Sequence, residues 1–152
     1  MMSAADSSVI WTHPYPQSTP LEAFRRYVNA THSLDLKSYN DLHTWSVTSI
    51  EHFAAAVWTF CGIKYSVPPT TIATGLDKMW PPPRWFPGAR MNYTENILSF
   101  GLDSRPDAIA ITAVKEGLQD VKQFTFLELK EQVAVWATTL KKFGVRVGDR
   151  IA

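Results

Sequence analysis

Proline is concentrated in residues 67–88, and this stretch limits what the chain can fold into more than any other feature. Its prolines are Pro68, Pro69, Pro81, Pro82, Pro83 and Pro87. Because proline lacks a backbone N–H and has a fixed φ, the stretch cannot form a regular helix or a central strand. Trp80, Trp85 and Phe86 lie among the prolines, as expected for a segment that wraps over its own core. We therefore predict an extended connector between two differently patterned parts.

The residues before the connector have the pattern of short amphipathic helices. A first helix is predicted to start at Thr19, a second to lie near residues 38–45, and a third to run from Thr48 to Gly62. Two capping boxes are predicted at helix starts, Thr19 with Glu22 and Thr48 with Glu51. This part is therefore expected to be helical.

After the connector the pattern changes from helix to strand. A short helix is predicted from Asn92 to Phe100, with Gly101 as its end. Apolar runs then predict two strands, residues 108–114 and 121–126, and the short turn between them predicts a hairpin.

The longest predicted helix follows this hairpin. Thr125 and Glu128 form a capping box at its start, and Gly144 ends it after Phe143. Its apolar stripe is Leu129, Val133, Trp136, Leu140 and Phe143. This spacing predicts that Trp136 belongs to a core. A turn and the first residues of another strand follow, so we expect the chain to be the truncated start of a sheet-containing domain.

The near-zero net charge gives no electrostatic indication of a nucleic-acid or membrane partner. The chain has 15 basic and 14 acidic residues, a formal net charge of +1, and no apolar run long enough to span a membrane. Its single cysteine, Cys61, cannot form an internal disulfide and is predicted to pack on the stripe of the third helix. The start, MMSAADSS, lacks the pattern of a secretory signal. We expect a cytoplasmic protein.

Residues that could carry chemistry are sparse. A phosphate loop needs closely spaced glycines, but Gly144 and Gly148 are separated by bulky residues. The four histidines and the cysteine lack the paired spacing of metal ligands. Asp41, His43 and Ser46 could be assembled into a triad, but they crowd one segment and are better explained by helix-terminal roles. We assign no catalytic residue and no metal site.

Three blocks of sequence resemble one family of enzymes. The block that begins at Trp85, WFPGARMNYTENIL, resembles the segment before the catalytic domain in the acetyl-CoA and acetoacetyl-CoA synthetases. Their helical N-terminal region is similar to YNDLHTWSV followed by EHFAAAVWTFCGI. The opening strand–helix–strand of the adenylate-forming superfamily is similar to FTFLELKEQVAVWATTLKKFGVRVGDRIA. The run FRRYVNATHSLDLKSYNDLHTWSV favours the acetoacetyl branch, and the resemblance covers roughly residues 10–152.

The resemblance implies an α/β fold: a helical N-terminal cap followed by the incomplete start of the large N-terminal domain of an adenylate-forming enzyme. The expected parts are a flexible arm (1–18), the helical cap (19–66), the Pro/aromatic connector (67–91) and the truncated start of the adenylation domain (92–152).

The function implied by the resemblance is that of an acetoacetate–CoA ligase of lipid and ketone-body metabolism. Such an enzyme converts ATP, acetoacetate and CoA into acetoacetyl-CoA, AMP and pyrophosphate. The longer enzyme uses ATP, Mg²⁺ and CoA, and the family's ATP-binding and catalytic motifs lie downstream of these residues. This chain is therefore expected to bind none of these cofactors and to be inactive alone. Its expected partner is the remainder of the adenylation domain, together with the small-molecule substrates.

The resemblance also implies one candidate site. In the acetyl branch a Trp-Phe-x-Gly-Gly turn lies beside the nucleotide end of CoA, which would place Phe86, Gly88 and Ala89 near CoA. This chain has Ala89 where that branch has its second glycine. Arg90 is the candidate for a phosphate contact, and an exposed salt bridge is its alternative role.

Two other interpretations stay open at this point. The chain could be a non-catalytic interaction module whose Pro–Trp stretch or helix face recruits a partner, as polyproline ligands do. It could also be a fragment of another short-chain acyl-CoA synthetase, because no residues of this sequence indicate a pocket that selects the acid.

Overall fold

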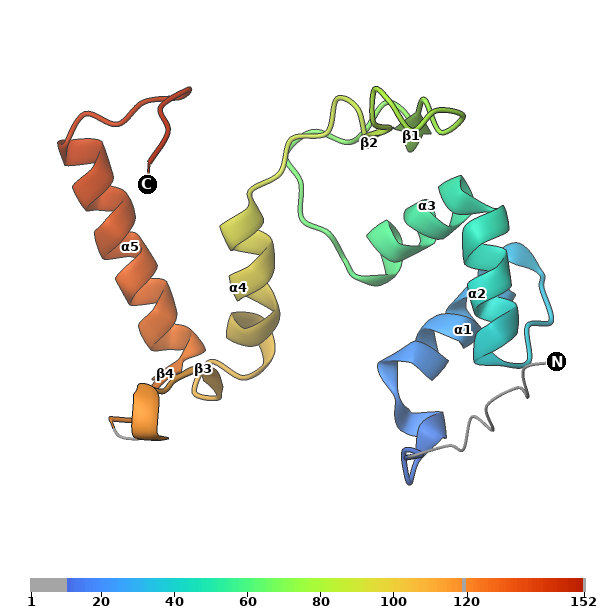
Figure 1. Cartoon of the computed structure of the whole chain (residues 1–152), viewed down its shortest axis with the longest axis horizontal. Coiled ribbons are helices and arrows are strands. Elements are labelled where there is room, and N and C mark those ends of the chain that lie inside the picture. Colours follow the sequence, from blue (N-terminus) through green and yellow to red (C-terminus); the bar gives the residue numbers. More distant parts are fainter. Residues whose placement is uncertain (1–10, 119, 152) are drawn as a thin grey trace, which may run out of the picture. The chain divides into compact units, whose positions relative to one another are not determined.

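The computed structural model describes residues 11–118 and 120–151 (Figure 1). The helices are α1 (Pro20–His32), α2 (Tyr39–Thr48), α3 (Ile50–Phe60), α4 (Tyr93–Ser104) and α5 (Phe126–Lys142), with 3-10 turns η1 (Pro16–Ser18) and η2 (Glu116–Leu118). The strands are β1 (Ala73–Thr74), β2 (Arg84–Trp85), β3 (Ile109–Ala113) and β4 (Lys122–Thr125). The strands form two antiparallel pairs, β1–β2 and β3–β4. Helices with small sheets confirm the predicted α/β class.

The chain divides into two compact units. The described residues of the first unit run to Ile63 and from Val67 to Ala89, and those of the second are Lys64–Ser66 and the residues from Arg90 onward. The expected division into arm, cap, connector and adenylation-domain start stays a prediction. Residues 1–10 of the expected arm lie outside the described residues.

The core of the first unit lies between α1, α2 and α3. Its buried side chains are Phe24, Val28, Leu42 and Ala56, and Val28 has no solvent-exposed surface. The partly buried side chains packed around them are Tyr27, Leu36, Trp45, Phe53 and Val57. Burying one such large side chain stabilises the fold by about 1.5–3 kcal/mol. The predicted helical character of this part is confirmed.

Only half of the capping box predicted at the start of α1 forms. The Thr19 hydroxyl accepts a hydrogen bond from the backbone N of Glu22 at 3.3 Å. The Thr19 N–H instead donates to the carbonyl of Pro16, at 3.2 Å. The Glu22 carboxylate is therefore released to accept from the Arg25 guanidinium, at 2.6 and 2.8 Å. These hydrogen bonds and the charge of Arg25 hold the pKa of Glu22 below its ordinary value.

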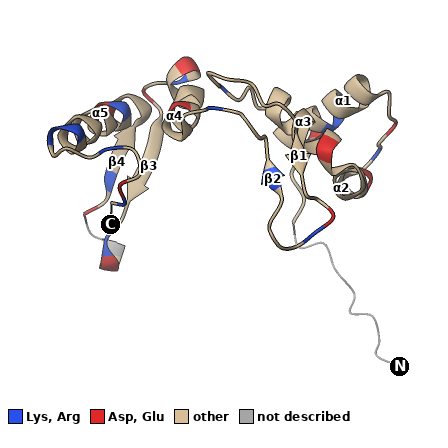
Figure 2. Cartoon of the chain, turned by 90° about the horizontal axis from the view of Figure 1, so that it is seen from above, with Lys and Arg blue, Asp and Glu red and all other residues tan. Residues whose placement is uncertain are grey.

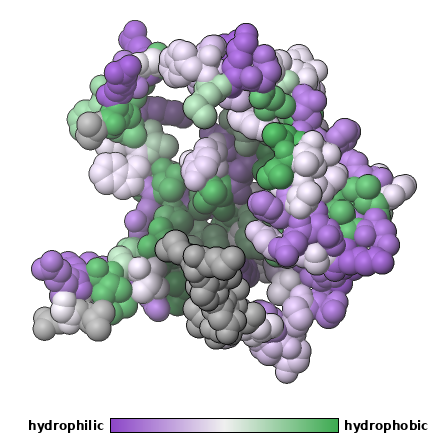
Figure 3. Space-filling view, turned by 45° about the vertical axis from the view of Figure 1, so that its right-hand side comes forward, coloured by the Kyte–Doolittle hydropathy of each residue, from purple (hydrophilic) through white to green (hydrophobic). Residues whose placement is uncertain are grey.

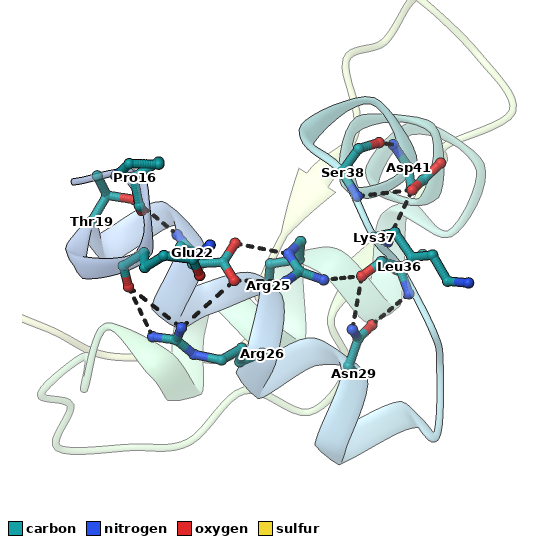
Figure 4. Close-up of polar contacts among 11 residues, drawn as sticks. Pro16, Thr19, Glu22, Arg25, Arg26, Asn29, Leu36, Lys37, Ser38 and Asp41 are labelled. Carbon is teal, nitrogen blue, oxygen red and sulfur yellow. Dashed lines mark hydrogen bonds and ion pairs between the residues drawn. The ribbon is translucent and has the colours of Figure 1, made fainter. Parts of the chain in front are cut away.

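The loop between α1 and α2 is fixed by one asparagine side chain (Figure 4). The Asn29 amide donates to the carbonyl of Leu36 and accepts from its N–H, both at 2.9 Å. The guanidinium of Arg25 donates to the same carbonyl. Both backbone groups of Leu36 are thus satisfied by helix α1, although no strand pairs with them.

Helix α2 begins with a complete capping box that was not predicted from sequence. Ser38 Oγ accepts from the N–H of Asp41 at 3.2 Å, and Asp41 Oδ2 accepts from the N–H groups of Ser38 and Lys37, both at 2.9 Å. The backbone donor of Lys37 comes first among the causes that hold the pKa of Asp41 below its ordinary value. Asp41 is therefore a capping residue, as the helix-terminal interpretation predicted.

The predicted capping box at Thr48 and Glu51 is wrong. Helix α2 runs on through Thr48, whose hydroxyl donates to the carbonyl of Thr44 at 2.8 Å. The N-cap of α3 is Ser49, which makes no side-chain capping bond. The predicted helices are present, but the boundary between them lies one residue later because Thr48 bonds back along α2.

Cys61 is exposed, which corrects the prediction that it packs in a core. It is the C-cap of α3, and Gly62 follows it with a φ of +61°. The chain therefore turns away at this position, although the helical spacing places Cys61 on the same stripe as Val57.

The second unit contains the predicted hairpin and the predicted long helix. Strands β3 and β4 pair antiparallel, with Ile111 opposite Phe124 and a bulge between Ile109 and Ile111. Helix α5 begins with the predicted box: the Thr125 hydroxyl accepts from the N–H of Glu128 at 3.2 Å, and the Glu128 carboxylate accepts from the N–H of Thr125 at 2.8 Å. The hairpin and this helix start are confirmed.

Helix α4 does not end at Gly101 as predicted, but runs on to Ser104. Gly101 is buried, and a Cβ at this position would overlap the ring of Phe126. The glycine therefore permits the first turn of α5 to lie against α4, rather than ending the helix. Asn96 of α4 holds the passing segment at Lys64 by two hydrogen bonds, at 2.7 and 2.9 Å.

Trp136 is 66% exposed and Phe143 is 81% exposed, which corrects the prediction that Trp136 belongs to a core. No described residue of α5 is buried. Val133 and Ala137 face a hollow that is shared with Leu98 of α4, whereas Trp136 lies on the side of β4. A single neighbouring helix covers only part of the apolar stripe of α5.

Charged residues of both signs are interspersed over the two units (Figure 2). No helix within the described ranges combines the length and apolar character that a membrane crossing requires. Large apolar side chains also reach the surface (Figure 3). Met79 and Trp80 are 95% and 83% exposed.

We predict that Asp41→Asn lowers the stability of the first unit at neutral pH and weakens its dependence on acid. The folded pKa of Asp41 is lowered, so its contribution is complete above the unfolded value, near pH 4, and is lost as the pH falls through the folded value. Urea midpoints followed by circular dichroism at pH 6 and at about pH 2.5 measure both effects.

The matched control is Asp77→Asn, which removes an exposed loop carboxyl of the same unit. We expect this variant to keep the wild-type midpoint at pH 6. Equal midpoints at pH 6 for Asp41→Asn and the wild type would contradict the assigned capping role.

Candidate functional site

The candidate CoA-proximal residues Phe86, Gly88 and Ala89 form one tight turn. The N–H of Ala89 donates to the carbonyl of Phe86 at 3.1 Å, and Pro87 and Gly88 occupy the two central positions. Gly88 has a φ of +81°, the value that the third residue of a type II turn requires and that glycine adopts without strain. Proline at the second position fixes the other central φ, so the sequence Pro-Gly encodes this turn directly.

The turn is fastened to the segment before β1. Both the N–H and the hydroxyl of Thr70 donate to the carbonyl of Pro87, at 2.9 and 3.0 Å. The N–H of Phe86 donates to the carbonyl of Ile72 at 2.8 Å. A Cβ on Gly88 would lie 3.1 Å from the Thr70 methyl group, so glycine is favoured both by its φ and by this close approach.

Phe86 itself has a positive φ of 47°, which costs a residue with a side chain about 1–2 kcal/mol. Its ring compensates by packing on Trp58 of α3, with ring centroids 4.4 Å apart. A strained backbone conformation of this kind persists only where the surrounding contacts stabilise it. The Trp58 ring and the hydrogen bonds of Thr70 therefore hold the turn in place. Neither was predicted from sequence, because their contacts join residues far apart in the chain.

Arg90 follows the turn but belongs to the second unit. Its carbonyl accepts from the N–H and hydroxyl of Ser66, at 2.8 and 3.2 Å. Its exposed guanidinium makes no hydrogen bond or ion pair with any residue in the described ranges. The expected alternative, a surface salt bridge of Arg90, is thus not formed within the part of the chain that the structure covers.

Two cations line a hollow in the loop between β1 and β2 of the first unit. It measures about 630 Å³, and Lys78 and Arg84 contribute the positive charges while Asp77 contributes a negative one. Prolines 81–83 form part of its wall. These charged residues were not predicted from sequence, because no motif marks a hollow formed by a loop that closes between β1 and β2.

The described residues contain no catalytic cluster of the kinds considered from sequence. Ser46 Oγ donates to the backbone carbonyl of His43 at 2.8 Å, and Asp41 caps α2, so these residues form no triad. Among residues 11–118 and 120–151, no three His, Cys, Asp or Glu side chains are grouped closely enough to hold a metal ion.

The sequence of this chain is similar to the N-terminal part of known acyl-CoA synthetases. Residues 39–97 match the family described as acetyl-coenzyme A synthetase N-terminus. The chain is 36% identical over 146 residues to acetoacetyl-CoA synthetase of Danio rerio, covering 96% of this chain and 21% of that one. It is 34% identical over 147 residues to malonamoyl-CoA synthetase vrtB of Penicillium aethiopicum, covering 95% and 20%.

A solved structure shows the same fold. Acetoacetyl-CoA synthetase from Streptomyces lividans matches with a TM-score of 0.77 and 32% identity, over 89% of this chain and 20% of that one. The fold and the matching block thus define an N-terminal region of the acetyl-coenzyme A synthetase type. More particularly, the chain corresponds to the N-terminal region of the acetoacetyl-CoA synthetases. It spans about a fifth of the length of these relatives.

We predict that Gly88→Ala opens the turn locally, because alanine is strained at positive φ and its methyl group presses on Thr70. The expected cost is about 2 kcal/mol, which corresponds to about 30-fold faster exchange of the hydrogen-bonded amides of Thr70 and Phe86. Hydrogen exchange followed by NMR measures this change.

Gly75→Ala is the matched control, since Gly75 has a φ of +74° but no neighbouring atom within 4 Å of the place that an added methyl group would take. It shares the strain without the collision, so we expect a cost of about 1 kcal/mol. Equal exchange rates in the two variants would show that Thr70 does not restrict position 88.

Proposed function

We propose that the chain is the N-terminal region of an AMP-forming acid–thiol ligase that makes acetoacetyl-CoA from acetoacetate, ATP and CoA. The observation that carries this proposal is the agreement of nearly the whole chain, in sequence and in fold, with acetoacetyl-CoA synthetases of two distant organisms. One aligned block would support only a shared superfamily. Agreement over both units supports the same enzyme family.

In this proposal the chain contributes structure, and the rest of the ligase contributes the reaction. Adenylation requires a phosphate-binding loop, Mg²⁺ and stabilisation of charge at the attacked carboxyl group. Within the described ranges there is no acidic or histidine cluster for the metal, and the nearest pair of glycines, Gly144 and Gly148, lies beyond the end of α5. ATP and Mg²⁺ are therefore assigned to residues outside this chain.

The acid is the least constrained part of the proposal. The Penicillium relative, named for malonamoyl-CoA, is nearly as similar as the vertebrate enzymes. Acetoacetate and malonamate both carry a carbonyl group two carbons from the carboxylate and differ by CH₃ against NH₂. An acid of this shape is the substrate class that both relatives support.

A non-catalytic interaction module is the second candidate, and one observation favours it. Met79 and Trp80 protrude from the loop between β1 and β2 and are 95% and 83% exposed. Exposed tryptophan is enriched at the energetic centres of protein interfaces. This candidate requires a partner that binds the loop of the isolated chain.

We predict that the 152-residue chain alone catalyses no carboxylate-dependent exchange of pyrophosphate into ATP. The reaction reports adenylation without CoA, so it isolates the chemistry that we assign elsewhere. The full-length Danio rerio enzyme serves as the positive control. Exchange above background by the purified chain would contradict the proposal.

We also infer that Phe86, Gly88, Ala89 and Arg90 approach CoA only in the presence of the rest of the ligase. The support is that Arg90 has an exposed guanidinium with no partner among the described residues, and guanidinium groups bind phosphate strongly. The chain alone is expected to give no saturable heat with CoA in a calorimetric titration.

The test of this role uses a fusion of the chain to the downstream region of the Danio rerio enzyme. Arg90→Ala is expected to raise the KM for CoA by about tenfold and to leave pyrophosphate exchange unchanged, because that half-reaction does not use CoA. Arg146→Ala, which removes an exposed arginine of the same unit, is the matched control. Equal KM values for both variants would remove Arg90 from the proposed site.

A further inference from the structure

The second unit has a surface between α5 and β4 that no described residue of the same unit covers. A hollow of about 430 Å³ lies there, lined by Gln123 and Phe124 of β4 and by Glu128, Glu131, Gln132, Val135 and Trp136 of α5. We call Phe124, Gln132, Val135 and Trp136 the α5–β4 face. Val135 and Trp136 are each 66% exposed. They lie on a well-formed helix rather than on a loop, so their exposure is built into the fold.

The elements around this face are too few to be stable as a closed domain. A helix with a broad apolar stripe normally buries that stripe against a core, yet no described residue of α5 is buried. An isolated two-stranded sheet is marginal in water, and both outer edges of β3–β4 are unpaired within the described residues. Ile109 and Ile111 of β3 are 50% and 43% exposed.

The neighbouring helix accounts for only one side of α5. Leu98 and Leu102 of α4 share a hollow with Val133 and Ala137 of α5, and Gly101 brings the start of α5 against α4. Val135 belongs to the opposite side, and Trp136, about 60° from Val133, lies at the border towards β4. Position 135 follows two residues after Val133, about 200° around the helix, so α4 cannot cover both sides.

We propose that the α5–β4 face is the docking surface for the downstream polypeptide of the ligase, and that it receives an apolar, sheet-forming segment of it. The occupant follows from length: the relatives that match this chain over 95–96% of its residues are about five times longer. The unpaired strand edges have backbone groups that can pair with a further strand, and the exposed Trp136 ring can pack against an apolar surface. This inference rests on the proposed function, because it takes the occupant from the longer enzyme.

The test measures binding of this chain to the Danio rerio enzyme from which the matching N-terminal region has been deleted. Trp136→Lys and Val135→Lys are expected to weaken the dissociation constant at least about tenfold. Both side chains are mostly exposed, so the isolated chain keeps its wild-type circular dichroism. Trp80→Lys is the matched control, an exposed tryptophan of the first unit, and should bind as the wild type does.

Three outcomes would contradict the proposal that the α5–β4 face is the docking surface. The first is equal weakening by Trp80→Lys and Trp136→Lys, and the second is a homodimer that forms through Trp136 and persists when the downstream polypeptide is present. The third is failure of this chain to bind while the separated Danio rerio pieces bind each other. Recovery of pyrophosphate exchange on mixing reports the proposed function separately. Full recovery with Trp136→Lys would leave that function intact and reject the face.

Discussion

Hydrogen bonds from side chains to irregular backbone are the interaction on which this structure depends. Asn29 binds both backbone groups of Leu36, and Asn96 binds both backbone groups of Lys64. Thr70 holds the carbonyl of Pro87 through its N–H and its hydroxyl. The six prolines of residues 67–88 have no backbone N–H and keep this segment from entering a larger sheet. Long stretches between helices would therefore have unsatisfied polar groups without these contacts.

Burial of apolar surface is divided unevenly between the two units. The first unit has a small closed core around Val28, with aromatic rings packed over it. In the second unit only Leu98 and Gly101 are buried among the described residues. Helix α5 has a complete capping box at its start, and Lys141 and Lys142 complement its dipole at its end, but none of its side chains is buried. Capping and charge thus stabilise α5 more than packing does, as expected for one layer of a larger domain.

The division of labour that follows is physically simple. In the proposed ligase, the chain contributes helices and a fixed Pro-Gly turn, and we assign the ATP and acid chemistry to the additional length that the relatives have. The turn is strained at Phe86 and rigidly supported by Trp58 and Thr70. A rigid turn is useful beside a ligand because it loses little conformational entropy on binding. The same rigidity would serve a protein interface, so the two candidate functions share this feature.

The sequence by itself determined the elements whose signals are local. Thr125 with Glu128 specified the start of α5, Pro87-Gly88 specified the turn, and the proline content excluded long regular elements from residues 67–88. Only the tertiary structure decided which faces are covered. It placed Gly101 against Phe126, left Trp136 exposed and turned Cys61 out to solvent. Periodicity reveals that a helix has an apolar side, but whether a neighbour covers that side depends on contacts between distant residues, which no local pattern encodes.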